Sequence, residues 1–571
     1  MDSRSMSRFR SARGRRASWS ALAPGVSRAA FALSALAAGV LVAACSDNSS
    51  DGSGAEAGAA GDGAGSGGRA GSSGSSGSSG EGARPSGDAG QIGSGGDPTG
   101  GGGDSSGGAG DTGGEGGAGG ADGGDTPSCV AADDVEPAIV ALSSSNHDSF
   151  LAVTRDADGN IYALGFVESG NAPSIDRATV VARFDADGAL DPAFGDEGVA
   201  IVNVREAGIA ETARGLVLQS DGKLVVAGAV ETPNYDPSDV VRRGDTDLFL
   251  FRLRADGALD DTFGEDGFAF HDLNEGIEGT NSQGAAVVAG ADSQWGLSVF
   301  PNDELVVFGS QRGGSRSDAT PRTDSDWVVL KLDADGAPVT SFGTDGKFVL
   351  DIARANAAAR TTSLLEDGAI VAAGYATYAG TQRPVIFKLT PDGELDPSFG
   401  VQGVFSEPID TAAEAYAATL QSDGKLVTAG YGRPHADAMS ADWVSIRLTP
   451  AGILDRTYGT AGRTWLDVAG FGDNARSMTL LPDDRPVLVG GGRVEAANAD
   501  GVVAILTPDG QPDVTFAPGG CKTFDFGTAS DFLWGAALAP NAENIALVGT
   551  TGVAQGSTDD NDAVLVLLPL P

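Results

Sequence analysis

The residues that most often perform acid, base or metal chemistry are scarce in this chain. Its 571 residues include three histidines and three cysteines, which excludes most zinc, haem and iron–sulfur sites because these need several such ligands. His147, His271 and His435 lie far apart, and none stands near a serine or cysteine in a recognisable nucleophile motif. We therefore expect no catalytic residues, and interpret the histidines as isolated turn or strand residues.

Clustered aspartates are a second candidate for chemistry. Asp185, Asp187 and Asp191 reproduce part of the spacing of aspartate-rich calcium loops, and similar clusters recur along the chain. The position of the first calcium ligand is instead occupied, copy by copy, by Arg183, Arg252, Lys331, Lys388, Arg447 and Ile505. A cation there repels calcium and can pair with the turn carboxylates. We expect structural turns, no metal site and no cofactor, with calcium binding as the alternative.

Two long polar segments, residues 231–246 and 310–325, concentrate arginine in an otherwise acidic chain. Each connects two apolar runs and is longer than most of its counterparts elsewhere in the sequence. Loops on a rigid scaffold often carry ligand contacts. Our candidate ligand face therefore consists of Tyr235, Arg242, Arg243, Arg312, Arg316 and Arg322, with an anionic partner expected. The alternative is that both segments are solvated insertions without a ligand.

The elements that must position these residues are short and repeated. A turn followed by an apolar run that ends in glycine occurs seven times, as in Ser220-Asp-Gly-Lys-Leu-Val-Val-Ala-Gly228. The glycines that end the seven copies are Gly165, Gly228, Gly309, Gly374, Gly430, Gly490 and Gly549. Such internal repetition is typical of solenoids and propellers.

A second motif joins a turn to an aromatic residue and a glycine, as in Arg254-Ala-Asp-Gly-Ala-Leu-Asp-Asp-Thr-Phe-Gly264. Its six turn glycines, Gly188 to Gly510, are 69, 79, 57, 59 and 58 residues apart, so the second and third repeats carry insertions in a basic period just under sixty. Each repeat contains four short apolar runs separated by turn signals that suit tight hairpins. We predict an all-β chain that forms a single seven-bladed β-propeller.

The ends of the repeated region predict how the ring closes. The seventh repeat stops after its third strand, and a spare strand, residues 137–142, precedes the first repeat. We expect that strand to complete the last blade. Cys129 precedes it, and Cys521 begins the fourth strand of the neighbouring blade. A disulfide between them would pin the closure, although two free thiols remain the alternative at this point.

The paired motifs Ser220-Asp-Gly-Lys-Leu-Val-Val-Ala-Gly228 and Ala255-Asp-Gly-Ala-Leu-Asp-Asp-Thr-Phe-Gly264 resemble the delta-60 repeat family of secreted bacterial proteins. The resemblance covers nearly all of residues 145–571 and implies a β-propeller fold. It carries no activity and no catalytic residue that can be transferred. Pro338-Val339 and Ala517 depart from the repeated pattern, so the corresponding blades are expected to differ locally.

The first 44 residues have the features of a bacterial export signal. They carry seven arginines and one acid, and an apolar run from Ala29 to Ala44 that is short for a membrane span. The run ends Leu41-Val-Ala-Ala-Cys45, which resembles a lipobox and implies lipidation of Cys45; an ordinary signal peptide is the alternative. Ser46 follows instead of aspartate, which favours an outer-membrane or surface position.

Residues 45–128 are predicted to form a lipidated cysteine and a disordered Gly/Ser/Asp-rich linker, because 33 of the 87 glycines lie between Asp51 and Pro127. The propeller then spans residues 129–571. Removal of residues 1–44 changes the formal net charge from −41 to −47, which disfavours nucleic acid and leaves the lipid anchor as the membrane contact.

These features together predict a monomeric, surface-anchored binding or structural module. Its expected partner is an envelope or extracellular protein or glycan. The alternative is a propeller enzyme, a hydrolase or lyase acting on carbohydrate or a lactone, with carboxylates in the central channel.

Overall fold

The computed structural model describes residues 129–132, 135–143, 147–170, 176–205, 211–231, 246–274, 277–280, 286–289, 292–312, 324–378, 380–495, 498–527, 530–552 and 561–570. These residues form β-strands, turns and one short 3₁₀ segment, Pro518–Gly520. None of their helices is long and apolar enough to cross a membrane. The predicted export signal, Cys45 and the predicted linker lie outside the described residues.

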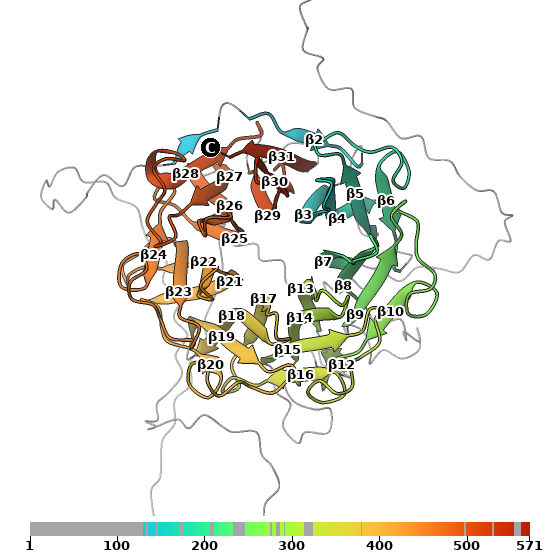
Figure 1. Ribbon diagram of the computed structural model, residues 1–571, viewed down its shortest axis with the longest axis horizontal. Coiled ribbons are helices and arrows are strands. Elements are labelled where there is room, and N and C mark those ends of the chain that lie inside the picture. Colours follow the sequence, from blue (N-terminus) through green and yellow to red (C-terminus); the bar gives the residue numbers. More distant parts are fainter. Residues whose placement is uncertain are drawn as a thin grey trace, which may run out of the picture. The chain divides into compact units, whose positions relative to one another are not determined.

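Seven antiparallel sheets stand around a centre, each with its first strand innermost (Figure 1). This arrangement confirms the predicted seven-bladed β-propeller. Blade 1 consists of β3 (Asp148–Arg155), β4 (Ile161–Ser169), β5 (Asp176–Phe184) and β6 (Val199–Val202). Blade 2 consists of β7 (Glu211–Leu218), β8 (Leu224–Glu231), β9 (Thr246–Leu253) and β10 (Phe268–His271). Blade 3 consists of β13 (Ser293–Val299), β14 (Leu305–Arg312), β15 (Ser325–Leu332) and β16 (Lys347–Leu350). Blade 4 consists of β17 (Ala357–Leu364), β18 (Ile370–Tyr378), β19 (Thr381–Leu389) and β20 (Val404–Phe405).

The remaining blades follow the same order. Blade 5 consists of β21 (Ala412–Leu420), β22 (Leu426–Arg433), β23 (Asp442–Leu448) and β24 (Arg463–Leu466). Blade 6 contains β25 (Asp473–Leu480), β26 (Pro486–Glu495), β27 (Asn498–Ile505) and β28 (Cys521–Phe524). Blade 7 contains β29 (Phe532–Leu538), β30 (Asn544–Thr550) and β31 (Ala563–Pro569). Its outermost strand is β2 (Ala138–Val140), which pairs antiparallel with β31 and closes the ring as predicted.

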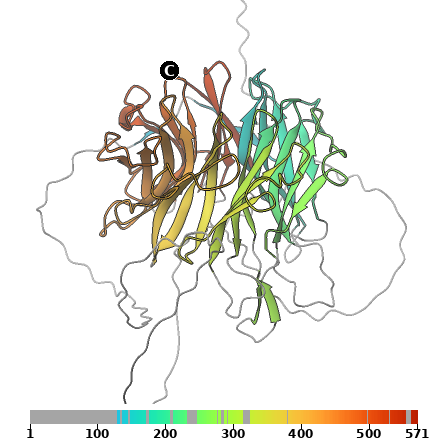
Figure 2. The ribbon, with the colours of Figure 1, turned by 60° about the horizontal axis from the view of Figure 1, so that its bottom comes forward.

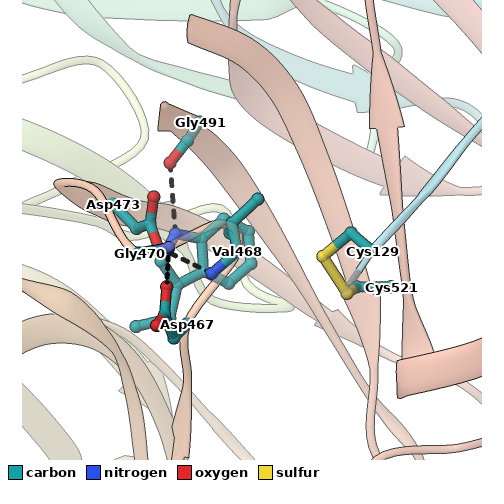
Figure 3. The surroundings of a disulfide bond; sticks show 8 residues. Cys129, Asp467, Val468, Gly470, Asp473, Gly491 and Cys521 are labelled. Atoms are coloured by element: carbon teal, nitrogen blue, oxygen red, sulfur yellow. Dashed lines mark hydrogen bonds between the residues drawn. A yellow bond between two sulfur atoms is a disulfide. The ribbon is translucent and has the colours of Figure 1, made fainter. Parts of the chain in front are cut away.

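The closing segment also contacts the preceding blade. β1 (Val130–Ala131) pairs parallel with β28 and adds a fifth strand to blade 6, which the sequence did not indicate. Cys129, at the start of this segment, forms a disulfide with Cys521 on β28, with Cα atoms 4.8 Å apart (Figure 3). One short segment therefore holds the outer edges of blades 6 and 7 together.

The hydrophobic core is divided among the junctions between neighbouring blades. Seven clusters of buried side chains each combine residues from two adjacent blades. The aromatic residues of the first five copies of the second motif, such as Phe194 and Tyr458, are buried there, and Phe516 of the sixth copy is partly buried. In the first five copies the glycine after the aromatic residue donates its N–H to the carbonyl of the residue before the turn glycine of the next blade, as from Gly195 to the Asp256 carbonyl at 2.8 Å. The second motif therefore links neighbouring blades through a buried aromatic side chain and a backbone hydrogen bond.

The spacing of 79 residues between the turn glycines Gly257 and Gly336 is due in part to an additional hairpin. β11 (Ile277–Thr280) pairs antiparallel with β12 (Ala286–Ala289) in the connection from blade 2 to blade 3. Figure 2 shows this hairpin projecting beyond the ends of the neighbouring strands. Sequence reasoning located an insertion in this part of the chain but did not predict a hairpin.

Candidate functional site

The innermost strand of every blade contains one residue that is skipped in the pairing register. On β21, for example, Ala415 pairs with Gly430 and Ala417 pairs with Ala429, so Tyr416 is left without a partner position on β22. The same shift occurs in all seven blades, always beside the glycine that ends the first motif. A skipped residue of this kind is a β-bulge, which turns its side chain away from the regular pleat.

The repeated glycine makes room for the bulge. A Cβ atom built on Gly430 would collide with the carbonyl oxygen of Glu414 on the inner strand. Corresponding collisions with inner-strand backbone occur at the other six glycines of the motif. Glycine is therefore required at these positions by the close approach of two backbones.

The seven bulge residues meet in one pocket at the centre of the ring, with a volume of about 260 Å³. In chain order they are Leu151, Arg214, Trp295, Arg360, Tyr416, Arg476 and Trp534. Arginine and aromatic residues alternate from blade 2 to blade 7, and the leucine of blade 1 interrupts the series. We call these seven residues the channel ring. Within the described part of the chain, the pocket lining contains three arginines and no aspartate or glutamate.

The arginines of the channel ring lie over the faces of the aromatic side chains. The guanidinium carbon of Arg360 is 3.7 Å from the ring centroid of Trp295 and 4.6 Å from that of Tyr416. Arg214 lies 4.4 Å from Trp295, and Arg476 lies 4.4 Å from Tyr416. Each such contact stabilises a cation by roughly 0.5–2 kcal/mol, more where water is excluded. The aromatic rings therefore hold the guanidinium planes in place.

One carboxylate balances part of this charge. Glu414 is fully buried, and its Oε2 lies 3.9 Å from Nη2 of Arg360. Burial alone lowers the pKa of Arg360, but Tyr416 and the Glu414 carboxylate outweigh burial and raise that pKa above its usual value. Burial, with Glu414 adding to it, also raises the pKa of Tyr431, which stays a neutral phenol. With three arginines and one glutamate, the centre of the ring carries a formal charge of +2.

Arg360 has hydrogen-bonding capacity that the protein does not use. It is 7% exposed, and its Nε and Nη1 atoms are buried without a hydrogen-bond partner among the described residues. The phenolic oxygen of Tyr416 is also buried without a hydrogen-bond partner among the described residues. Because buried donors without partners are costly, such groups commonly mark a place where a ligand or water completes the network.

The candidate ligand face from the sequence falls almost entirely outside the described residues. Of its six residues, Tyr235, Arg242, Arg243, Arg316 and Arg322 lie outside the described residues. Arg312 is the last residue of β14, opposite Ser325, and its carbonyl oxygen accepts a hydrogen bond from Asn274 Nδ2 at 2.7 Å. The proposal for this face therefore stays a prediction.

The aspartate turns have the predicted local structure. Asp185 Oδ1 accepts hydrogen bonds from the N–H groups of Asp187 and Ala189, at 3.0 and 2.9 Å, which is an Asx turn. The expected ion pairs are present: Arg183 with Asp191, Arg252 with Asp260, Lys388 with Asp396 and Arg447 with Asp455, at 3.3, 2.8, 3.0 and 2.9 Å. The third copy has Val339 in place of the aspartate, and there Lys331 pairs with Glu304 at 3.0 Å. This is the local difference expected of that repeat.

Carboxylates also gather at three blade junctions. The triples are Asp324, Asp326 and Asp351; Asp442, Asp467 and Asp473; and Asp500, Asp525 and Asp531, each with oxygen atoms within 4.8 Å. Asp473, near the disulfide in Figure 3, accepts hydrogen bonds from the N–H groups of Val468 and Arg493, at 2.8 and 3.2 Å. Burial outweighs these bonds and, with the neighbouring Asp467 and Asp442, raises the pKa of Asp473 to about 8. This carboxyl joins backbone segments at a blade junction.

The three histidines remain separate. His147 is exposed, and its Nδ1 accepts a hydrogen bond from the Asn561 N–H at 3.2 Å. His271 Nε2 lies 3.2 Å from the Gly336 carbonyl oxygen, and burial lowers its pKa. His435 is exposed in the loop between β22 and β23.

Sequence reasoning missed the channel ring, although a signal for it exists. Six of its residues precede the glycine of the first motif by 14 positions, as Tyr416 precedes Gly430, and Trp534 precedes Gly549 by 15. Aligning the repeats on these glycines places the ring residues in one column. Only the bulge, however, shows that this column points into the channel.

Comparisons with known proteins agree with the fold. Residues 157–194, 219–263 and 365–399 match a family model described as "Domain of unknown function (DUF5122) beta-propeller". No curated protein matches the chain. Similar solved structures include a protein of unknown function from Dyadobacter fermentans, with 11% identity, TM-score 0.38, and coverage of 76% of this chain and 98% of that one.

Two further structures are comparably similar. Sqt1 from Chaetomium thermophilum shows 11% identity, TM-score 0.37 and coverage of 76% of this chain and 100% of that one. Kuenenia stuttgartiensis hydrazine synthase shows 10% identity, TM-score 0.38 and coverage of 76% and 99%. The sheet topology and the family model together identify the chain as a seven-bladed β-propeller built from repeats, three segments of which match a propeller family without an assigned function.

Proposed function

We propose that this protein is a monomeric binding module, anchored to the surface of a bacterial envelope, and that its channel ring is the ligand site. The observation that carries the proposal is the convergence of all seven bulge residues on one pocket, where arginines alternate with aromatic residues. Pockets with aromatic walls and a few convergent polar groups are typical binding sites.

The chemistry of the pocket favours binding over hydrolysis. Arginine stays protonated at physiological pH, so it positions anions but does not exchange protons readily. An acid–base pair for glycoside or lactone cleavage needs two titratable groups facing the substrate. The pocket lining within the described residues holds no such pair, and Glu414 is engaged with Arg360 beside it.

The anchor is part of the same proposal. Cys45 is lipidated after removal of residues 1–44, residues 45–128 form the linker, and residues 129–571 form the propeller. The test is radiolabelled palmitate incorporation and membrane fractionation of the Cys45→Ala variant. Loss of label and release from the membrane are expected, and an unlabelled wild-type protein would contradict lipidation.

The proposed partner is an envelope or extracellular protein or glycan, without nucleic acid and without a cofactor. Calcium is the remaining cofactor alternative, because acidic turns recur in the repeats. Calorimetric titration of chelator-treated protein with calcium distinguishes the two, since heat from several sites per chain would contradict a cofactor-free protein.

The decisive experiment uses residues 45–571 with Cys45→Ser, screened on glycan arrays and against envelope extracts. Captured partners are retested with Arg360→Met and with Arg456→Met, a control on an exposed arginine. We expect Arg360→Met to abolish capture and Arg456→Met to leave it unchanged. Capture that survives Arg360→Met but is lost on charge reversal at Arg242, Arg243, Arg312 and Arg316 would move the ligand site to the loops.

A further inference from the structure

We propose that the channel ring binds a small hydroxylated dicarboxylate, whose two acidic groups are held by guanidinium groups of neighbouring arginines. This inference rests on the proposed function, because it names the ligand class of the same site. It is argued from the charge of the pocket, the orientation of its donors and its size.

The charge of the site selects an anion. The centre of the ring carries a formal charge of +2, although the whole chain carries −41. Arg360 is nearly enclosed, so its attraction for an anion is screened less than that of a surface arginine. A single negative charge leaves the site cationic, whereas a dianion neutralises it.

The stacking of the ring determines where donors point. A guanidinium group that lies against an aromatic face keeps its N–H groups in its own plane, where they can bind a carboxylate through two parallel hydrogen bonds. Arg360 lies over both Trp295 and Tyr416, whose rings meet edge to face, and its Nε and Nη1 have no partner among the described residues. Nε and one Nη atom form the usual pair for such a contact.

The number of arginines in the channel ring favours a ligand with more than one acidic group. Arg214, Arg360 and Arg476 come from alternate blades, and an aromatic residue separates each from the next. A contact with two parallel hydrogen bonds uses one carboxylate for each guanidinium group. A ligand that uses two arginines needs two acidic groups.

The remaining lining adds hydroxyl recognition. Ser298, Thr361 and Ser477 also line the pocket, and hydroxyl groups both donate and accept hydrogen bonds. The volume of about 260 Å³ is below the usual range for drug-sized ligands, so the ligand is small. Tartrate combines two carboxylates and two hydroxyls in a molecule of suitable size, and we choose it as the probe.

The experiment titrates residues 45–571 carrying Cys45→Ser with tartrate, by calorimetry and by tryptophan fluorescence. Trp295 and Trp534 belong to the ring, so ligand binding should change their emission. We expect acetate and dimethyl tartrate to bind at least about tenfold more weakly than tartrate, because one lacks the second charge and the other lacks both. Succinate tests the hydroxyls and should bind more weakly than tartrate.

Two variants test the geometry in opposite directions. Arg360→Met keeps an unbranched apolar side chain between the rings and should abolish tartrate binding, whereas Arg456→Met should leave it unchanged. Glu414→Gln removes the negative charge 3.9 Å from Arg360 with little change of shape, and should tighten tartrate binding by about three- to tenfold. If Arg360→Met fails to fold, Glu414→Gln still decides the question.

The outcomes separate this inference from the proposed function. Absence of tartrate binding in both the wild type and Glu414→Gln, with folded protein by circular dichroism, overturns the dicarboxylate proposal. The proposed function then stands if capture of an envelope partner still depends on Arg360. Capture that is independent of Arg360, or turnover of a captured glycan, overturns the proposed function itself.

Discussion

At the scale of single residues, the repeated glycine does more than end a strand. It allows the neighbouring inner strand to bulge, and the bulge presents one side chain per blade to the channel. That side chain has no partner position on the neighbouring strand, and its identity differs from blade to blade. The scaffold residue is therefore repeated, whereas the adjacent channel residue differs from blade to blade.

Replacing Gly430 by alanine tests whether the repeated glycine maintains the bulge and so positions the channel residue. The new methyl group collides with the Glu414 carbonyl, so we expect a loss of about 1–3 kcal/mol in the free energy of unfolding and a displaced Tyr416. Chemical denaturation measures the first effect, and Trp295 fluorescence reports the second, since its ring centroid lies 5.9 Å from that of Tyr416. Gly472→Ala, with open space around the position, is the matched control and should change neither.

At the scale of elements, neighbouring blades are joined by repeated hydrogen bonds of buried arginines as well as by apolar packing. Arg447 on β23 is 3% exposed and binds Asp455 in its own blade at 2.9 Å. It also donates to the Pro508 carbonyl of the next blade at 2.6 Å. Arg183 occupies the equivalent position in blade 1, where it is 21% exposed and pairs with Asp191 at 3.3 Å.

These two arginines should differ in their contribution to stability. We expect Arg447→Met to lower the free energy of unfolding by about 1.5–3 kcal/mol, because it removes hydrogen bonds of a buried guanidinium group, although Lys425 still lies 3.7 Å from Asp455 and Gln421 still donates to the Pro508 carbonyl. Arg183→Met should cost about 1 kcal/mol or less, since its ion pair is partly solvated. Urea denaturation of both variants measures the difference. Equal losses of unfolding free energy would contradict a larger stabilising role for the buried arginine.

Buried carboxyls at blade junctions predict a pH dependence. Burial raises the pKa of Asp148 to about 7 and, with neighbouring acids, that of Asp473 to about 8, from a usual value of 3.8. Between pH 3.8 and these values the native state holds more protons than the unfolded state. The free energy of unfolding contributed by these groups therefore falls as pH rises through that window.

The measurement is the melting temperature between pH 5 and pH 9. We expect it to decrease with pH, and we expect Asp148→Asn to reduce the slope because the asparagine does not titrate. Asp187→Asn, at an exposed turn position, should keep the wild-type slope. A melting temperature that rises over this range would show that these carboxyls are ionised in the folded protein.

At the scale of the whole molecule, the ring is closed by noncovalent pairing and by one covalent bond. β2 completes blade 7, β1 extends blade 6, and the disulfide joins positions 392 residues apart in the sequence. A crosslink that closes so long a loop removes much conformational freedom from the unfolded chain. The Cys129→Ser, Cys521→Ser double variant should therefore lose about 2–5 kcal/mol of unfolding free energy.

Guanidinium denaturation of this double variant and of the wild type, both without reductant, measures the loss. Wild-type protein with its disulfide reduced should behave like the variant, which controls for the substitutions themselves. An unchanged denaturation midpoint would mean that β1 and β2 hold the closure without the crosslink.

The sequence by itself determined the number of blades, their strands and the closing strand, because turn glycines and apolar runs encode local hairpins that recur with a basic period just under sixty residues. It also placed Cys129 and Cys521 near the closure, and predicted the Arg–Asp pairs of the turns. Only the tertiary structure decided which residues face the channel, because a bulge changes the direction of one side chain without changing the repeat. Sequence reasoning therefore sought carboxylates in the channel and arginines on the loops, whereas ring closure brings Arg214, Arg360 and Arg476 together from blades more than a hundred residues apart.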